Sequence, residues 1–355
     1  MTPQRLDAIL ARLPQVAIVV LGDYFLDRYF EIDPALAETS LETGRQAHQV
    51  VGTRCHPGAA GTIVANLCAL GVGGVLCVGF LGDDGEGFEL LRALRAMGAQ
   101  TDALLVRPDR ATPTYRKPLL RLPDGGLREL ERLDTKNRQP TPSDLEDHLL
   151  SHLRALVPAA DAIIAQDQVE EAECGAVTSR LRDTLAELAA ANPQKVWFGD
   201  SRLRVGEYRN LILKPNRREA CRAIHPDSPA HDSRQAHHCA AALSARVGRP
   251  VYLTLGAEGI SLVTPEQAQP LPAVPLAGPL DTVGAGDSAT AGLVSALSAG
   301  ADPLEAAIVG NLVASITVQQ IRATGTATQE QVRAQFARHA KLWRTLPPPL
   351  PLTRR

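Results

Sequence analysis

The chain of 355 residues has few aromatic side chains and almost no net charge. Aromatic residues make up 4% of the sequence, and the formal net charge is −2 at pH 7. A charge so close to zero gives no global positive field that would attract nucleic acid. No apolar run reaches the roughly 18 residues needed to cross a bilayer. We therefore expect neither nucleic acid nor a membrane among the partners of this protein.

Paired cysteines and a leader segment are also lacking. The six cysteines stand singly, several within apolar runs, and none belongs to a C-x-x-C pair. This favours reduced thiols over disulfides or a zinc site. Near the N-terminus, Arg5, Asp7 and Arg12 precede an apolar run of only seven residues, 16–22, which is typical of a helix and a strand rather than a signal peptide. We expect a cytoplasmic protein.

Short β-branched runs alternate with helical patterns along most of the chain. Residues 16–21 (VAIVVL) form the first run, and similar runs at 75–80, 161–165 and 195–199 follow. Polar clusters such as Gln166-Asp167 end these runs. The carboxyl ends of strands in an open parallel sheet form the usual ligand crevice. The sequence therefore predicts an α/β fold, with a mostly parallel central sheet flanked by helices and a site at one edge.

Two stretches do not fit this alternation. Residues 24–52 are too polar for a core segment, and residues 103–133 alternate with period two around a turn at 123–126. Together they predict a small antiparallel sheet over the strand ends, a β-lid that would exclude water from a phosphoryl group. An ordinary edge hairpin remains the alternative. The Pro-rich residues 347–352 predict an extended tail outside the core.

The motif with the clearest chemistry is D-T-V-G-A-G-D at residues 281–287, which precedes a helical run at 288–297. Small residues let backbone amides turn toward an anion, and the helix adds its positive end at the same place. Asp287 falls in the first helical turn, where a carboxylate can accept the proton of an attacking hydroxyl. A Gly-rich helix start without catalytic function is the competing interpretation.

Two further patterns fit phosphoryl transfer. Asn216 and Glu219 lie one helical turn apart after a strand, where they can hold the water shell of a magnesium ion. They also fit a helix cap, and the two interpretations are compatible. The strand 251–255 ends in a tight turn at Gly256 and Gly259, which can approach a nucleotide closely.

Taken together, these features resemble the PfkB sugar kinases, the ribokinase-like family, over about residues 15–340. D-T-V-G-A-G-D matches that family's D-T-x-G-A-G-D signature at every fixed position, and the N-x-x-E element at 216–219 and the T-x-G-x-x-G loop at 254–259 follow the family's order. The resemblance implies a ribokinase-like three-layer fold in one kinase domain over residues 1–345. It has a discontinuous β-lid from about 24–52 and 103–133, and a tail at 346–355.

The resemblance also implies the cofactors ATP and Mg²⁺ and a set of site residues. Asp287 is the implied catalytic base, and its ionised form is favoured by the helix N-terminus. Asn216 and Glu219 are implied for the metal. The amides of Gly284, Ala285, Gly286 and Asp287 form the implied anion hole. The implied nucleotide contacts are Lys214, Asn216, Thr254, Gly256, Gly259, Thr282 and Asn311.

Within the family, residues 22–29 and 131–134 look most like the heptose 7-phosphate kinase domain of lipopolysaccharide-precursor synthesis. The implied partner is a small sugar or sugar phosphate, with Asp23 and Asp27 as sugar contacts. Arg116 and Lys117 are candidates for a substrate phosphate, although two cations on a hairpin are often plain solvated surface. Nothing after residue 329 resembles the nucleotidyltransferase half of the bifunctional heptose enzyme.

One segment departs from the family pattern. Where the family has a P-G-G-A-x-N sugar-binding turn, this chain has Pro-Gly-Ala-Ala-Gly-Thr at residues 57–62. Gly58 is retained, Ala59 adds a methyl group, and Thr62 replaces an amide with a hydroxyl. The acceptor is therefore left open between a heptose phosphate, a free hexose or pentose, and a nucleoside, and a non-catalytic sugar or nucleotide sensor is a further alternative. An exposed lid edge predicts a homodimer.

Overall fold

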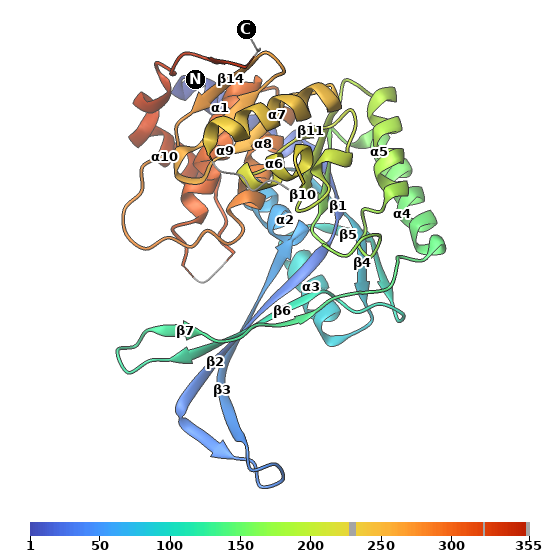
Figure 1. The fold of residues 1–355 in the computed structure, drawn as a ribbon, viewed down its shortest axis with the longest axis vertical. Helices are drawn as coiled ribbons and strands as arrows, with labels where there is room; N and C mark the ends of the chain where they lie inside the picture. Colours follow the sequence, from blue (N-terminus) through green and yellow to red (C-terminus); the bar gives the residue numbers. More distant parts are fainter. Residues whose placement is uncertain (227–231, 322–323, 353–355) are drawn as a thin grey trace.

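Two β-sheets organise the computed structural model, which describes residues 1–226, 232–321 and 324–352 (Figure 1). The larger sheet has the strand order β15-β14-β13-β12-β11-β10-β9-β1-β4-β5. Its strands are β1 (Ala17–Gly22), β4 (Gly74–Gly82), β5 (Gln100–Arg107), β9 (Ala162–Asp167), β10 (Val196–Ser201), β11 (Ile212–Leu213), β12 (Val251–Thr254), β13 (Ile260–Val263), β14 (Gln267–Leu271) and β15 (Leu350–Pro351).

In this sheet, neighbouring strands from β12 through β11, β10, β9, β1 and β4 to β5 are parallel. At the other edge, β13, β14 and β15 pair antiparallel. Alternate side chains of β1 enter two different cores: Ile18 and Val20 lie in one, Val19 and Leu21 in the other. Because both faces of this strand are covered, its sequence is continuously apolar. The predicted α/β fold with a mostly parallel sheet is confirmed.

Helices cover both faces of the larger sheet and give three layers (Figure 1). The first core contains residues of α1, α2, α3, α8, α9 and α10, and the second contains residues of α4, α5, α6 and α7. Their bounds are α1 Pro3–Arg12, α2 Ala60–Ala69, α3 Gly85–Ala96, α4 Ser143–Leu156, α5 Ser179–Ala191, α6 Arg217–Ile224, α7 Ser233–Val247, α8 Ala285–Ser298, α9 Pro303–Thr317 and α10 Gln329–His339. Within the described residues, no helix is both long and apolar enough to cross a membrane.

The smaller sheet projects from the body as the lid (Figure 1). It contains β2 (Tyr24–Thr39), β3 (Gln46–Ala59), β6 (Thr114–Arg121), β7 (Leu127–Glu129) and β8 (Leu133–Thr135). The hairpin expected around residues 123–126 is present as β6 and β7.

Two expectations about the lid need correction. Residues 103–107 belong to β5 in the larger sheet, and the first lid segment runs on to Ala59 rather than ending at 52. Nor is the sheet purely antiparallel, because β2 pairs in parallel with β6. The alternation at β5 was wrongly assigned to the lid, because a parallel edge strand that is buried on one face shows the same alternation as a hairpin strand.

The end of the chain also differs from the extended tail that we expected outside the core. Leu350 and Pro351 form β15 on the edge of the larger sheet, and Leu352 packs into the second core. The remaining three residues of the predicted tail, 353–355, lie outside the described residues.

Candidate active site

A cavity of about 880 Å³ lies beyond the carboxyl ends of the central strands, and it gathers one part of the predicted site. Every residue assigned to catalysis, nucleotide or metal lines it. These are Lys214, Asn216, Glu219, Thr254, Gly256, Gly259, Thr282, Gly284, Ala285, Gly286, Asp287 and Asn311. None of the residues assigned to the acceptor sugar lines this cavity.

The first turn of α8 presents Asp287 and free backbone amides to the cavity. Gly284 caps the helix in the left-handed conformation, with φ +75°, which a glycine adopts at little cost. The first intrahelical bond runs from Ser288 N to Gly284 O at 2.9 Å, so the amides of Gly286 and Asp287 precede the hydrogen-bonded ladder. The Ala285 amide instead donates to Thr282 O at 3.2 Å. Of the expected amides, that of Ala285 is therefore already used, whereas those of Gly286 and Asp287 remain available to an anion.

The carboxyl group of Asp287 lies at the cavity wall, where the residue is partly buried. Gln166, at the end of β9, donates from Nε2 to Asp287 Oδ1 at 3.2 Å. Burial, followed by the negative charge of Asp200, raises the pKa of Asp287, whereas Lys214 lowers it. The net result is a pKa of about 8. The ionised form expected from the helix N-terminus is therefore not the favoured form at neutral pH, because burial outweighs the dipole.

A buried ion pair lies beside the anion turn. Lys214 Nζ is 2.9 Å from Asp200 Oδ2, which also accepts a hydrogen bond from Thr290 Oγ1 at 2.9 Å. A Cβ atom built on Gly286 would lie only 3.4 Å from Lys214 Nζ, so the ammonium group sits against the turn. Burial lowers the pKa of Lys214, but Asp200 and Glu219 raise it, and the net direction is upward. Lys214 is thus a stable cation at the place where phosphate charge would move.

Asn216 and Glu219 form a reciprocal cap at the start of α6. Asn216 Oδ1 accepts from Glu219 N at 2.9 Å, and Glu219 Oε2 accepts from Asn216 N at 2.8 Å. This reciprocal cap uses one of the two carboxylate oxygens of Glu219. Burial, followed by the negative charge of Asp200, raises the pKa of Glu219 to about 7.

This arrangement fits magnesium better than a fully protein-coordinated metal. Among the described residues, no cluster of three or more His, Cys, Asp or Glu side chains could hold an ion. Mg²⁺ usually keeps several waters and takes one or two carboxylates together with substrate phosphates. Glu219 and Asn216 line the cavity at a helix start, where they could hold such a hydrated ion.

The far part of the cavity has a largely apolar lining. Gly256 and Gly259 have φ values of +62° and +105°, and a Cβ on Gly259 would clash with Leu271 O at 2.2 Å. The turn can therefore be this tight only with glycine. Asn311 is buried and donates weakly to Leu271 O at 3.4 Å. Apolar walls come from Val274, Leu276, Leu280, Ala314 and Val318.

Asp23, an expected sugar contact, instead anchors the loop between β9 and α5. Its Oδ2 accepts from the amides of Gln168 and Val169 at 2.8 and 2.9 Å, and its Oδ1 accepts from Ala176 N at 2.7 Å. Burial, followed by the negative charge of Asp167, raises the pKa of Asp23 to about 6, whereas the three backbone amides lower it. Both oxygens accept hydrogen bonds from the backbone, which gives Asp23 a structural role, and its contact with a sugar stays a prediction.

The two lid candidates for a substrate phosphate, Arg116 and Lys117, each pair with a carboxylate. Arg116 and Lys117 are adjacent on β6, so their side chains point to opposite faces of the sheet. Arg116 Nη2 lies 2.6 Å from Glu86 on α3, whereas Lys117 Nζ lies 3.2 Å from Asp27 on the other face. The two cations therefore cannot bind one phosphate together.

The altered turn at residues 57–62 meets the catalytic turn directly. A Cβ built on Gly284 would lie 3.1 Å from Thr62 Cγ2, so the two turns are in contact. Thr62 Oγ1 donates to Pro57 O at 3.2 Å, and a Cβ on Gly58 would lie 3.1 Å from Asp27 Oδ2. This contact brings Thr62, one of the residues predicted to bind the acceptor sugar, to the turn that carries Asp287, although Thr62 does not line the main cavity.

Sequence reasoning assigned no role to Gln166 and Asp200, which hold Asp287 and Lys214 in place. The available signal was their position, because each ends an apolar strand at the edge where the cavity lies.

Comparisons with known proteins agree with this geometry. The model of the pfkB family carbohydrate kinases matches residues 26–330. The bifunctional protein HldE of Pelobacter propionicus is 28% identical over 345 residues, which are 96% of this chain and 67% of that protein. The chain spans about two thirds of the length of such relatives.

Solved structures share the fold at lower identity. Arabidopsis thaliana ribokinase, complexed with ribose and ATP, has a TM-score of 0.67 at 19% identity and covers 90% of this chain and 98% of its own. Escherichia coli phosphofructokinase-2, in complex with substrates and products, has a TM-score of 0.67 at 15% identity, with 92% and 99% covered. Since the family match covers most of the chain, the protein belongs to the pfkB family of carbohydrate kinases.

Proposed function

We propose that the protein transfers the γ-phosphoryl group of MgATP to a hydroxyl of a sugar or sugar phosphate, with heptose 7-phosphate as the first candidate. The carrying observation is Asp287, which lies partly buried in the first turn of α8 beside free amides and the cation of Lys214. This places a base and positive groups at one point, as phosphoryl transfer requires.

In the proposed mechanism, Asp287 accepts the proton of the attacking hydroxyl. Gln166 orients the carboxylate through Oδ1, while the amides of Gly286 and Asp287 and the ammonium group of Lys214 stabilise charge on the moving phosphoryl group. Asn216 and Glu219 would hold the hydrated Mg²⁺, which neutralises phosphate charge. The apolar slot near Leu276 and Asn311 would receive the base of the nucleotide.

The identity of the acceptor has one specific competitor. The similarity to HldE proteins supports a heptose phosphate, but both lid cations expected to bind its phosphate are paired with Glu86 and Asp27. This pairing favours, as the second candidate, an acceptor without a phosphate group, such as a free sugar or a nucleoside.

An acceptor panel with ATP and Mg²⁺, followed by ADP release, tests the proposal. It should contain heptose 7-phosphate, the free heptose, hexoses, pentoses and nucleosides, with Asp287→Asn in parallel to subtract background ATP hydrolysis. We expect turnover of a sugar or sugar phosphate. Strong turnover of nucleosides alone would contradict it, and tight sugar binding without ADP formation would indicate a sensor.

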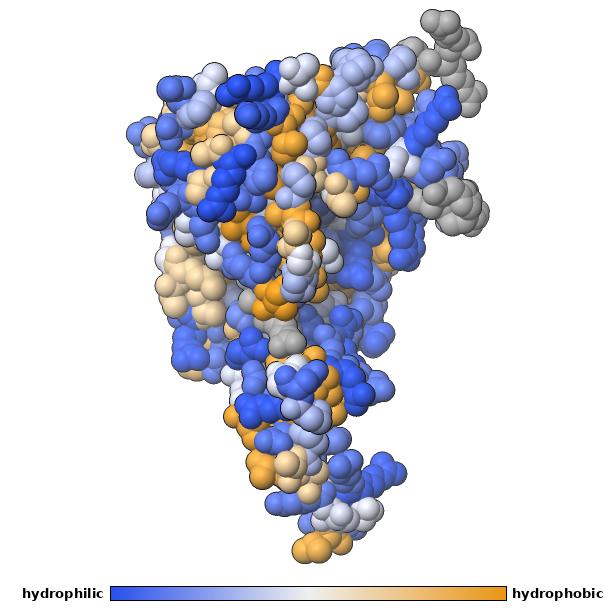
Figure 2. Space-filling view, turned by 90° about the vertical axis from the view of Figure 1, so that its left-hand side faces the viewer, coloured by the Kyte–Doolittle hydropathy of each residue, from blue (hydrophilic) through white to orange (hydrophobic). Residues whose placement is uncertain are grey.

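We also propose a homodimer that forms through the lid. The β2–β3 ribbon projects beyond the body, and apolar side chains are visible on this narrow projection (Figures 1 and 2). Leu36, Val50 and Val51 on this ribbon are 52%, 50% and 40% exposed. An exposed strand edge with apolar side chains is well suited to pair with a second copy.

A further inference from the structure

Two arginines of α6 belong to the wall of the main cavity. Arg218 and Arg222 both line it, and they stand four positions apart in the helix, so their side chains lie on one face. Arg218 is exposed and Arg222 is partly buried. Among the residues that the structure describes, neither guanidinium group has a partner in a hydrogen bond or an ion pair. We call these two residues the α6 arginine pair.

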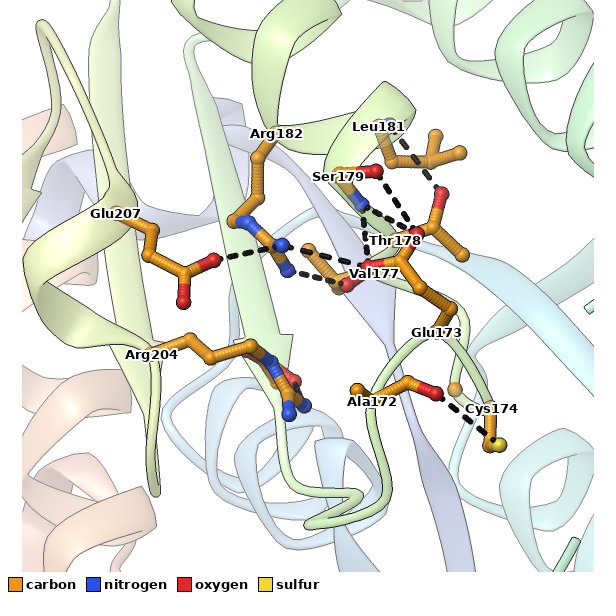
Figure 3. A network of polar contacts seen from close by, with 12 residues as sticks. Ala172, Glu173, Cys174, Val177, Thr178, Ser179, Leu181, Arg182, Arg204 and Glu207 are labelled. Carbon is orange, nitrogen blue, oxygen red and sulfur yellow. Dashed lines mark hydrogen bonds and ion pairs between the residues drawn. The ribbon is translucent and has the colours of Figure 1, made fainter. Parts of the chain in front are cut away.

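Other arginines of this region are bound to carboxylates. Four of them lie 2.6 to 2.8 Å from their partners, in the pairs Arg182–Glu207, Arg202–Glu170, Arg204–Asp167 and Arg217–Glu258. Figure 3 shows the side chain of Arg182 directed at Glu207. A charged group in a partly enclosed place is normally paired. The α6 arginine pair lacks this compensation within the described part of the chain and is therefore available to a ligand.

The other charged groups in the cavity wall are already accounted for. Lys214 and Arg202, the two other cations there, pair with carboxylates at 2.9 and 2.8 Å. Glu219 and Asp287 have roles as metal ligand and base in the proposed mechanism. The α6 arginine pair therefore adds two positive charges at one place in the wall, which suits an anion with more than one negative charge.

Arg218 stands where a cation is unfavourable for the helix. It is the second residue of α6, directly after the first turn begins, and the N-terminus of a helix carries a partial positive charge. Arg222 suits the last turn of the helix but repels Arg218, since like charges four positions apart are destabilising. A bound anion would offset both effects, because it interacts favourably with the guanidinium groups and with the helix end.

The pair extends away from the turn at residues 256–259, the proposed nucleotide contact. α6 begins beside that turn, where Asn216 forms a β-bridge with Thr254. The other end of the helix packs on the segment after β10, because a Cβ atom built on Gly206 would lie 3.1 Å from Ala223 Cβ. The pair thus continues the cavity wall from the proposed metal residues toward the end of β10.

From this arrangement we infer that the α6 arginine pair is a subsite for a phosphate group. The planar guanidinium fork matches the oxygens of phosphate and can bind two of them at once. The inference rests on the proposed function, because that reaction brings two sources of phosphate to this cavity: the terminal phosphate of the triphosphate, and a phosphate group that the acceptor carries. The second source would use this pair in place of the lid cations, whose charges are already paired.

The first test measures nucleotide binding by calorimetry. It compares a non-hydrolysable ATP analogue with ADP, each with Mg²⁺, on the wild type and on the double variant Arg218→Gln/Arg222→Gln. If the pair holds the terminal phosphate, the affinity of the double variant for the analogue should fall about tenfold or more, and its affinity for ADP should stay within about twofold, because only the analogue loses hydrogen bonds to charged groups.

The second test measures the acceptor. Heptose 7-phosphate and the free heptose are compared on the same two proteins, by kcat/KM where turnover occurs and by calorimetry where it does not. If the pair holds the phosphate of the acceptor, the double variant should lose about tenfold or more with the phosphorylated sugar and stay within about twofold with the free sugar. A selective loss in either test supports the inference and identifies the source of the phosphate.

Arg154→Gln is the matched control. Arg154 lies in the last turn of α4 and outside the cavity lining, and among the described residues its side chain has no hydrogen bond or ion pair. This variant should leave all four affinities unchanged. The double variant should melt no lower than the wild type, because it removes a repulsion between like charges and a cation at a helix start. A loss of affinity is then not a consequence of unfolding.

The outcomes separate this inference from the proposed function. Unchanged affinities in the double variant overturn the subsite, and so does an equal loss for ligands with and without the tested phosphate; with normal turnover, the kinase proposal stands in both cases. Conversely, a wild type that turns over no acceptor, together with a selective loss of the ATP analogue in the double variant, rejects the kinase proposal and keeps the subsite. A wild type that binds none of the four ligands overturns the subsite as well.

Discussion

At the scale of single residues, burial determines how Asp287 responds to pH. Its pKa of about 8 lies far above that of an exposed aspartate, mainly because the carboxylate is removed from water. A general base works only when deprotonated, so activity should require pH values near or above this pKa.

We predict that kcat/KM falls about tenfold for each pH unit below 8 and levels off above it, because this ratio reports the free enzyme. The measurement is a pH profile of initial rates between pH 6 and 9.5. Glu219, with a pKa near 7, adds a second limb that should disappear in Glu219→Gln. A flat profile over this range would contradict the assignment of a buried Asp287 as the base.

Single residues also show where sequence reasoning stops. The D-T-x-G-A-G-D motif predicted the position of Asp287 in the first helical turn, because helix starts follow local sequence. It did not predict the raised pKa, which depends on Asp200 and on enclosure by distant segments. Asp23 was assigned to sugar for the same reason, since only the fold brings the amides of the 168–176 loop to its carboxylate.

At the scale of elements, the start of α6 combines a helix cap with the proposed metal site. Glu219→Gln keeps an oxygen that can accept from Asn216 N but removes the negative charge. We predict that the Mg²⁺ concentration for half-maximal activity rises about tenfold or more, while the melting temperature changes little. The measurement is a magnesium titration of activity beside thermal unfolding.

A matched control exists in α9. Asp302 and Glu305 form the same reciprocal cap away from the cavity, so Glu305→Gln tests the loss of a cap charge at a place without a proposed metal. Glu305 also pairs with Arg5 at 2.8 Å, and the variant loses this ion pair as well. This variant should leave the magnesium dependence unchanged. An equal shift in both variants would contradict the metal role of Glu219.

Asn66 connects three elements behind the site. Its Nδ2 donates to Thr62 O, Ser288 Oγ and Gly325 O, and its Oδ1 accepts from Ala327 N. We predict that Asn66→Ala lowers the free energy of unfolding by about 2–4 kcal/mol, because several buried groups lose their partner. Urea denaturation measures this loss.

Asn192→Ala serves as the comparison, because its side chain makes one bond to Leu188 O at the end of α5. It should cost less than about 1 kcal/mol. Equal losses in the two variants would show that Asn66 does not tie the catalytic helix to the turn at 57–62.

At the scale of the whole molecule, the lid is the feature that local sequence defined least well. Its hairpin was predicted from period-two alternation and turn residues, whereas β5 was misplaced and the parallel β2–β6 pairing was missed. Register between strands far apart in sequence depends on tertiary packing, which a local pattern does not encode. The larger sheet was predictable because its parallel strands are short and apolar, and because β4, β9 and β11 are each followed by a helix.

We predict that the protein is a dimer in solution, with about twice the 37.9 kDa mass of one chain, because the lid exposes an apolar ribbon. Size-exclusion chromatography with light scattering measures the mass. Val50→Lys on β3 should give monomers, whereas Met97→Lys, at an exposed apolar residue after α3, should not. A monomeric wild-type protein would contradict lid-mediated pairing.

The proposed phosphoryl transfer depends on Asp287 as the base. Its folded-state pKa of about 8 lies above the usual aspartate value of about 4, so this carboxyl group destabilises the fold increasingly between about pH 4 and pH 8, and by its full amount above pH 8. Asp287→Asn should therefore be at least as stable as the wild type at pH 8. The most direct measurement is the turnover of Asp287→Asn with ATP and the best acceptor, beside the wild type at pH 8. We predict a loss of about 10²- to 10⁴-fold in kcat with the fold retained. Near-normal turnover by this variant would contradict the central claim.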